Sequence, residues 1–145
     1  MTETAKTILG FDFGTKKIGV AVGQSVTQTV TPLVTLPSKN QKPDWDKIET
    51  LINEWQPNIF VVGLPYNKDG EDQPMTLAAK KFANQLNGRF RLPVELMDER
   101  YSSYEAELRL KETKTNKKQT NKRQTAMDID KIAAQLIVES WFRQK

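Results

Sequence analysis

The sequence predicts an α/β fold in which helices flank a mixed β-sheet. Short apolar strands follow one another in the first part of the chain, strands alternate with amphipathic helices after that, and a final amphipathic helix reaches the C-terminus. The first pattern is typical of an antiparallel three-strand meander, and the second indicates two further, parallel strands. We therefore expect one domain spanning residues 1–145.

The predicted meander comes first. Residues Thr7–Gly14 and Lys17–Gly23 are rich in β-branched and aromatic side chains, and a tight turn at residues 14–16 joins them. The third strand is expected over Thr29–Leu36, and the prolines in and after it indicate an edge position or a strand end.

Helices and strands alternate in the middle of the chain. Apolar residues at helical spacing predict a helix over Trp45–Trp55. The continuously apolar segment Ile59–Leu64 is typical of a central strand. A second helix is expected over Met75–Leu86, with Gly88 at its C-terminal end, before a short strand over Val94–Met97. The two strands around this helix should be parallel.

The last part of the chain combines a polar segment with an apolar-patterned helix. A helix is expected to begin in Tyr104–Leu110, and residues 111–125 contain no apolar side chain, so we expect a mobile basic loop there. The final amphipathic helix is predicted over Ile129–Trp141. Asp128 stands directly before it, where an N-cap would be.

Charge and missing residue types limit the possible chemistry. The chain has 22 basic and 18 acidic residues, a net charge of +4, which points weakly to a polyanionic partner. With no cysteine and no histidine, disulfides, thiolate metal sites, Ser-His-Asp triads and histidine bases are excluded. No apolar run reaches membrane-spanning length and the N-terminus lacks an export signal, so we expect a cytoplasmic protein.

Asp12 is an acidic residue in the middle of an apolar strand. A carboxylate there needs a cation or hydrogen-bond donors as partners. Alternation places Gly10 and Gly14 on the same face, which predicts open space beside the carboxylate for an ion or a substrate. The alternative is an Asp bonded to the backbone in a bulge or turn.

Two more acidic positions lie far from Asp12 in the sequence. Asp98 and Glu99 directly follow a predicted strand of the parallel pair, where ligands of α/β sheets bind, although a solvated loop would also contain acids. Asp130 lies on a helix flank with Ala133, whose small side chain permits close approach to the sheet. A capping or surface role is the alternative for Asp130. Three oxygen donors without histidine suit Mg²⁺ or Mn²⁺.

Four segments, in this order, resemble the YqgF/RuvX family: FDFGTKKIGVAVG, VVGLP, DERYSS and DIDKIAAQLIVESWF. This family comprises bacterial pre-16S rRNA nucleases, formerly described as Holliday junction resolvases. The resemblance extends from Ile8 to Phe142. It implies an RNase H-like fold, metal-dependent cleavage of phosphodiester bonds, and a role in maturing the 5′ end of 16S rRNA.

The resemblance also implies which residues act. It assigns catalysis and metal binding to Asp12, Glu99 and Asp130, and so favours Asp130 over Asp128. Related nucleases often have four ligands, and Asp98, Asp128 or water is a candidate for the fourth.

Basic residues are candidates for binding nucleic acid. Lys16, Lys17 and Arg100 lie close to the acids in the sequence. The predicted loop adds Lys114, Lys117, Lys118, Lys122 and Arg123. A solvated run of charge is the alternative. The expected partner is pre-16S rRNA or branched DNA, bound by a monomer or a weak homodimer.

Three other functions compete with this interpretation. The segment from Asp12 to Thr15 also resembles the first phosphate loop of actin-like ATPases and sugar kinases, but these need a second domain and a second glycine-rich loop. A non-catalytic RNA-binding assembly factor would keep its function without Asp12. A junction resolvase would need a symmetric dimer.

Overall fold

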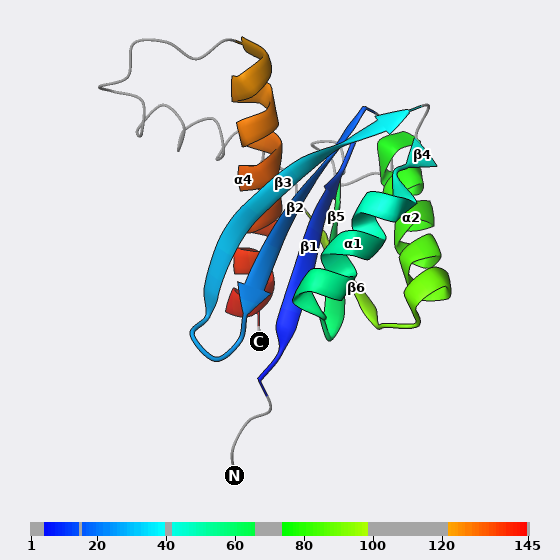
Figure 1. The fold of residues 1–145 in the computed structure, drawn as a ribbon. Helices are drawn as coiled ribbons and strands as arrows, with labels where there is room; N and C mark the ends of the chain where they lie inside the picture. The colour runs from blue at the N-terminus through cyan, green and yellow to red at the C-terminus, as the bar shows by residue number, and fades with distance from the viewer. Residues whose placement is uncertain (1–4, 15, 40–41, 66–73, 99–121, 145) are drawn as a thin grey trace, which may run out of the picture.

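The computed structural model contains a six-stranded mixed sheet with helices on both faces (Figure 1). It describes residues 5–14, 16–39, 42–65, 74–98 and 122–144, with residues 122–130 described by their backbone. The strands are β1 (Thr7–Phe13), β2 (Lys17–Gln24), β3 (Thr29–Lys39), β4 (Lys42–Pro43), β5 (Ile59–Leu64) and β6 (Val94–Asp98).

The sheet has the strand order β4-β3-β2-β1-β5-β6. Strands β1, β2 and β3 form the predicted antiparallel meander, and the short β4 pairs with the end of β3. Strand β5 is parallel to β1 on one side and to β6 on the other. The predicted α/β class, a meander plus two parallel strands flanked by helices, is therefore confirmed.

Three helices are described: α1 (Trp45–Trp55), α2 (Pro74–Phe90) and α4 (Lys122–Arg143). Helix α1 begins and ends where predicted. Its start is stabilised by Asp44, the N-cap, which accepts a hydrogen bond from the backbone N–H of Lys47. Helix α2 continues past Gly88, so the predicted C-terminal end was wrong. Arg91 instead has the left-handed φ of 56° after the helix, and its N–H donates to the carbonyl of Asn87. None of the described helices is long and apolar enough to cross a membrane.

Helix α4 begins at Lys122, earlier than its apolar pattern predicts. Lys, Arg, Gln and Ala favour helix, so the packed part of α4 extends into this polar segment. Residues 122–125 of the predicted basic loop are consequently helical, and Asp128 is inside the helix rather than at its N-cap. The remainder of that loop and the helix predicted at Tyr104–Leu110 lie outside the described residues.

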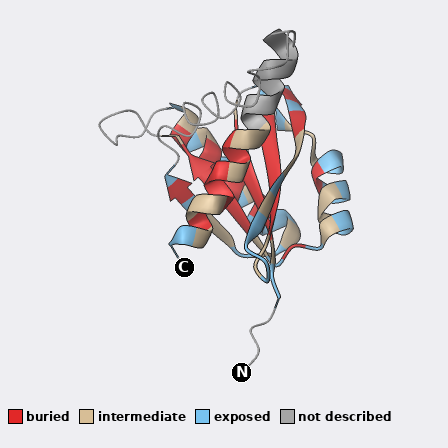
Figure 2. Ribbon diagram, turned by 90° about the vertical axis from the view of Figure 1, so that its left-hand side faces the viewer, coloured by how far each residue is buried: buried red, intermediate tan, exposed pale blue. Residues whose placement is uncertain are grey.

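The two faces of the sheet bury separate cores. Helices α1 and α2 cover one face, where Phe11 of β1 makes an edge-to-face contact with Phe82 of α2. Helix α4 covers the other, where Ile8 and Val61 cluster with Val138. Figure 2 shows the buried strands behind α4 and the buried inner side of this helix. Successive residues of β1 therefore alternate between two helical layers.

Candidate metal and nucleic-acid site

Asp12 lies near the end of β1, on the sheet face covered by α4. It is opposite Gly19 on β2. Because alternate side chains of a strand share a face, Asp12 lies on the same face of β1 as Gly10 and the buried Ile8. Its side chain is half-buried. The carboxylate is therefore positioned by a strand whose other residues are held in two cores, yet it keeps access to solvent or to a cation.

The glycines beside Asp12 do not leave the predicted open space. A Cβ on Gly10 would overlap Cγ2 of Val138 and would lie 3.5 Å from the carbonyl oxygen of Ala134. A Cβ on Gly14 would lie 2.8 Å from the carbonyl oxygen of Lys17, inside the turn. The space above Gly10 is thus taken by α4. A glycine on a strand face suits either a ligand or a closely packed helix, and the strand alone does not distinguish them.

Helix α4 runs antiparallel to β1 across this face. Gly23 is opposite Ile8 at the start of β1, and a Cβ there would lie 2.7 Å from Cγ1 of Val138 and 3.2 Å from the ring of Phe142. Gly10, two residues further along β1, lies against Val138 and Ala134. Residues closer to the carboxyl end of β1 therefore lie against residues closer to the amino end of α4.

The same progression relates Asp12 to Asp130. Two strand residues span about 6.6 Å and four helix residues about 6 Å, so the steps along the two elements stay matched. The next step along β1 after Gly10 is Asp12, and the next along α4 after Ala134 is Asp130. Continued packing in this register would bring the backbone of Asp130 to the level of Asp12. The side chain of Asp130 lies outside the described part of the chain.

Asp98 ends β6 on the opposite face of the sheet from Asp12. It is opposite Leu64, which belongs to the core beneath α1 and α2, whereas Met97 before it belongs to the core beneath α4. Because side chains alternate along a strand, this register argues against Asp98 as the fourth ligand. Glu99 lies outside the described residues.

The donor types fit a hard divalent cation. Within the described ranges, no three acidic side chains are grouped closely enough to hold a metal, and two of the predicted ligand side chains fall outside those ranges. Asp12 supplies a half-buried carboxylate, and the chain has neither histidine nor cysteine. Carboxylate oxygen without nitrogen or sulfur suits Mg²⁺ or Mn²⁺ better than Zn²⁺ or copper.

The predicted nucleic-acid-binding residues are only partly described. Lys16 is exposed and Lys17 is half-buried at the turn that follows β1, where the backbone N–H of Ser38 donates to the carbonyl of Lys16 at 2.8 Å. These two lysines are thus at the same end of β1 as Asp12. Lys122 and Arg123 belong to the first turn of α4 by their backbone. The other predicted residues lie outside the described part: Arg100, Lys114, Lys117 and Lys118.

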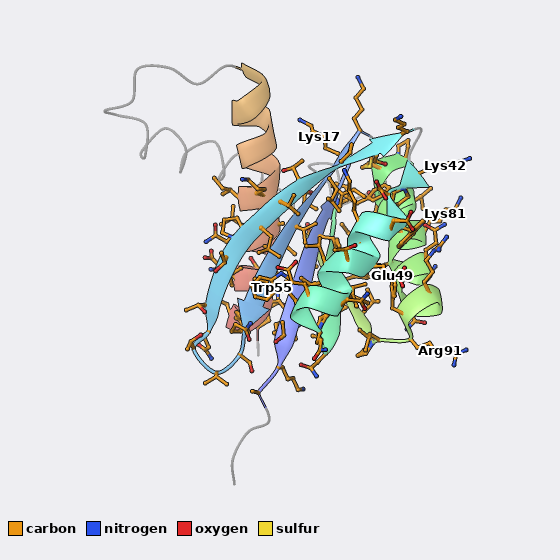
Figure 3. All side chains as sticks on the ribbon, in the orientation of Figure 1. Lys17, Lys42, Glu49, Trp55, Lys81 and Arg91 are labelled. Atoms are coloured by element: carbon orange, nitrogen blue, oxygen red, sulfur yellow. The ribbon has the colours of Figure 1, made fainter. Side chains whose placement is uncertain are left out.

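The structure adds a cationic groove that the sequence did not predict. We call it the basic groove; its cavity has a volume of about 470 Å³, and its described lining residues are Phe13, Lys42, Pro43, Trp45, Ala78, Lys81, Gln85 and Arg89. Figure 3 shows Lys42 and Lys81 at the α1 and α2 side of the sheet. No pattern could have revealed it, because its three cations are up to 47 residues apart in the chain, from 42 to 89.

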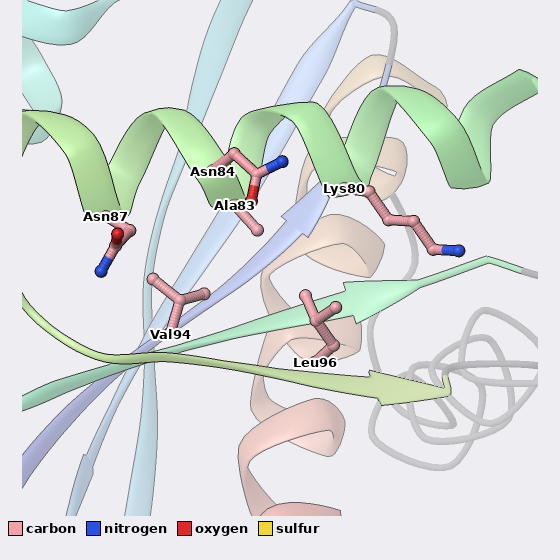
Figure 4. Close-up of a pocket in the computed structure, with 6 residues that line it drawn as sticks. All are labelled: Lys80, Ala83, Asn84, Asn87, Val94 and Leu96. Carbon is pink, nitrogen blue, oxygen red and sulfur yellow. The ribbon is translucent and has the colours of Figure 1, made fainter.

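A second cavity, of about 290 Å³, lies between α2 and the edge strand β6 (Figure 4). Lys80, Asn84 and Asn87 of α2 face Val94 and Leu96 across it. The Asn87 amide already donates to the carbonyl of Leu92 at 3.0 Å. With one cation among its described lining residues, this cavity offers less to an anion than the basic groove does.

Known proteins match the chain along almost its whole length. A protein from Saccharophagus degradans described as "Putative pre-16S rRNA nuclease" is 51% identical over 143 residues, covering 97% of this chain and 96% of its own. A protein of the same description from Actinobacillus pleuropneumoniae is 51% identical over 138 residues, covering 95% of this chain and 97% of its own.

Solved structures match the fold at low sequence identity. RuvC of Thermus thermophilus in complex with a Holliday junction substrate has a TM-score of 0.54 at 13% identity, covering 95% of this chain and 94% of that one. The fowlpox virus resolvase in complex with Holliday junction DNA also has a TM-score of 0.54, at 15% identity, covering 95% and 97%. The predicted RNase H-like fold is thereby confirmed.

A sequence model of one family matches residues 6–144, and that family is described as RuvX, Holliday junction resolvase. This match covers all six strands and all three described helices. Together with the relatives that are about half identical to it, the match shows that this chain belongs to the RuvX family.

Proposed function

We propose that this protein is a metal-dependent nuclease that hydrolyses phosphodiester bonds in the precursor of 16S rRNA. Nuclease activity follows from membership of a family whose relatives are described as nucleases. The observation that supports the assignment of the site is the close packing of α4 on β1 at Gly10, two residues before Asp12 on the strand and on the helix that carries Asp130. The description of the relatives as pre-16S rRNA nucleases supports the choice of substrate.

In this proposal Asp12, Glu99 and Asp130 hold the metal. Glu99 directly follows β6 in the sequence, and its place in this set rests on the resemblance to the family. A bound divalent cation would supply activation of a water molecule and stabilisation of the leaving oxygen. The three carboxylates would hold and orient it, and the largely buried strand β1 fixes the position of the half-buried Asp12. Lys16 and Lys17 contribute positive charge at the same end of β1, where the phosphate backbone approaches.

Cleavage assays on two substrates test this function. Labelled precursor 16S RNA and a four-way DNA junction are incubated with wild type, Asp12→Asn or Asp46→Asn, with Mg²⁺, Mn²⁺ or a chelator. Asp46 is an exposed acid in the first turn of α1 and serves as the matched control. We expect RNA cleavage that the chelator abolishes and that Asp12→Asn reduces by at least about a hundredfold, with the control unchanged.

Other outcomes separate the alternatives. Cleavage of the junction but not the RNA would support the resolvase function that describes the family, and would reject the RNA substrate. Cleavage by Asp12→Asn at the wild-type rate would remove Asp12 from the site. If wild type cuts neither substrate yet binds the RNA, the protein is a non-catalytic RNA-binding factor and the proposal is wrong.

A further inference from the structure

A column of stacked side chains leads from β1 into the basic groove. Phe13 stacks on Phe82 with ring centroids 5.0 Å apart, and Phe82 stacks on Trp45 at 5.6 Å. The guanidinium carbon of Arg89 lies 4.3 Å from the centroid of the Trp45 ring. The guanidinium of Arg89 therefore lies over an indole that is itself stacked on Phe82. This arrangement limits the conformational freedom of Arg89 before any ligand binds.

All the charged residues among the described lining of the basic groove are basic: Lys42 of β4, and Lys81 and Arg89 of α2. Within the described part of the chain, none of these three cations forms an ion pair. Three cationic residues that line one cavity raise the positive potential there, which favours an anion.

The groove fits a phosphate better than other anions of similar charge. A guanidinium held over a ring presents its N–H donors in a rigid planar fork, which matches the oxygens of a phosphate group. Lysines on either side add point charges for neighbouring phosphates. A cavity of about 470 Å³ is of the size that holds a small ligand or a short part of a chain, and is too small for a duplex.

The position of the groove relates it to the site on the other face. Phe13 at the base of the column directly follows Asp12, and the two side chains lie on opposite faces of β1. A single strand that reaches Asp12 at the carboxyl end of β1 can therefore pass over this edge of the sheet into the groove.

We propose that Lys42, Lys81 and Arg89 form a phosphate-binding subsite for a single-stranded segment of the substrate next to the cleaved bond. This inference rests on the proposed nuclease function. The subsite reads the phosphodiester backbone, which RNA and DNA share, and contributes affinity without sequence preference.

Binding of labelled oligonucleotides without divalent metal tests the subsite. Single-stranded RNA and DNA of the same sequence are titrated by fluorescence anisotropy at several salt concentrations. The variants are Lys42→Gln, Lys81→Gln, Arg89→Gln and the triple substitution. Lys47→Gln is the matched control, because Lys47 is exposed on α1 two residues, about 200°, around the helix from Trp45.

The triple variant should bind the RNA at least about tenfold more weakly at low salt. Its plot of log affinity against log salt should be shallower by about 2, since each single-strand phosphate contact contributes about 0.7. DNA should show the same change. An unchanged salt slope would overturn the subsite, and if Asp12→Asn still abolished cleavage the proposed function would stand. Failure of wild type to bind either oligonucleotide would also reject the subsite, and the cleavage assay with metal would still decide the proposed function.

Two further measurements test the role of the stacked guanidinium. Arg89→Lys retains the charge but loses the planar fork, so it should weaken binding nearly as much as Arg89→Gln. Wild-type affinity in Arg89→Lys would mean that Arg89 contributes only its positive charge, and would contradict the preorganised contact. Poly-glutamate of matched charge serves as a competitor. If it bound more tightly than RNA and depended on the same three residues, the groove would be a site for an acidic protein partner instead.

Discussion

Gly10 of β1 is in such close contact with Val138 of α4 that a single added methyl group would overlap the valine side chain. The backbone of Gly10 does not have the left-handed φ that would itself require glycine. The residue is therefore needed for the approach of the helix and not for its conformational freedom. This contact sets the distance between β1 and α4, the two elements that carry Asp12 and Asp130.

Gly10→Ala should consequently lower the free energy of unfolding by about 1–3 kcal/mol, the usual cost of overpacking a buried site. Val138→Ala in the same chain should recover part of this loss, because the overlapping methyl group is removed. Urea unfolding of the two single variants and the double variant gives the coupling. Additive effects would contradict the contact.

Gly88→Ala serves as the matched control, because the new Cβ meets nothing within 4 Å. Its free energy of unfolding should rise by up to about 1 kcal/mol.

The two acids at the end of β6 should differ in their effect on cleavage. Asp98→Asn should leave the rate within about threefold of wild type, because Asp98 faces away from Asp12. Glu99→Gln should reduce the rate by at least about a hundredfold, as for the ligand Asp12. Single-turnover cleavage of precursor RNA measures both. A larger loss in Asp98→Asn than in Glu99→Gln would reverse the assignment.

Metal binding should be visible without any substrate. A ligand that binds only the folded state stabilises it by about 2.7 kcal/mol at a hundredfold excess over its dissociation constant. Thermal unfolding of wild type should therefore shift upward as Mg²⁺ or Mn²⁺ is added, and the shift should vanish in Asp12→Asn. Samples without added metal and samples with a chelator provide the baseline. Equal shifts in both proteins would place the metal elsewhere.

Trp141 of α4 is joined to the sheet by a hydrogen bond from its indole N–H to the carboxylate of Glu95 on β6. Only 8% of Trp141 is exposed, so removing the donor leaves a half-buried carboxylate without this partner. Trp141→Phe should therefore lower the free energy of unfolding by about 1–3 kcal/mol. Glu95→Gln should cost less, since its amide oxygen still accepts. A double-mutant cycle by urea unfolding measures the pair, and zero coupling would exclude it.

Local patterns accounted for most of the secondary structure but not for all of its ends. Apolar spacing located α1 and the buried strand β5, whose bounds were as predicted. It placed the start of α4 too late, because helix propensity extended this helix through polar residues that make no apolar pattern. It ended α2 at Gly88, although Arg91 adopts the left-handed conformation. Helix ends depend on backbone contacts that apolar spacing does not report.

The candidate site was predicted in the same partial way. Asp12 stood out because an isolated carboxylate in an apolar strand is costly, and the structure places it half-buried on the face of α4. The interpretation of Gly10 was wrong, since its space belongs to Val138. The assignment of Asp98 as a possible fourth ligand depended on strand register, which no single strand contains.

By itself the sequence determined the mixed α/β class and the order of its elements, and it supplied the candidate metal ligands, because periodicity and residue chemistry are local properties. Only the tertiary structure decided that Asp12 and Asp98 lie on opposite faces, what fills the space above Gly10, and that Lys42, Lys81 and Arg89 line one groove. Those outcomes follow from packing and register between segments far apart in the chain, where each contact depends on all the others.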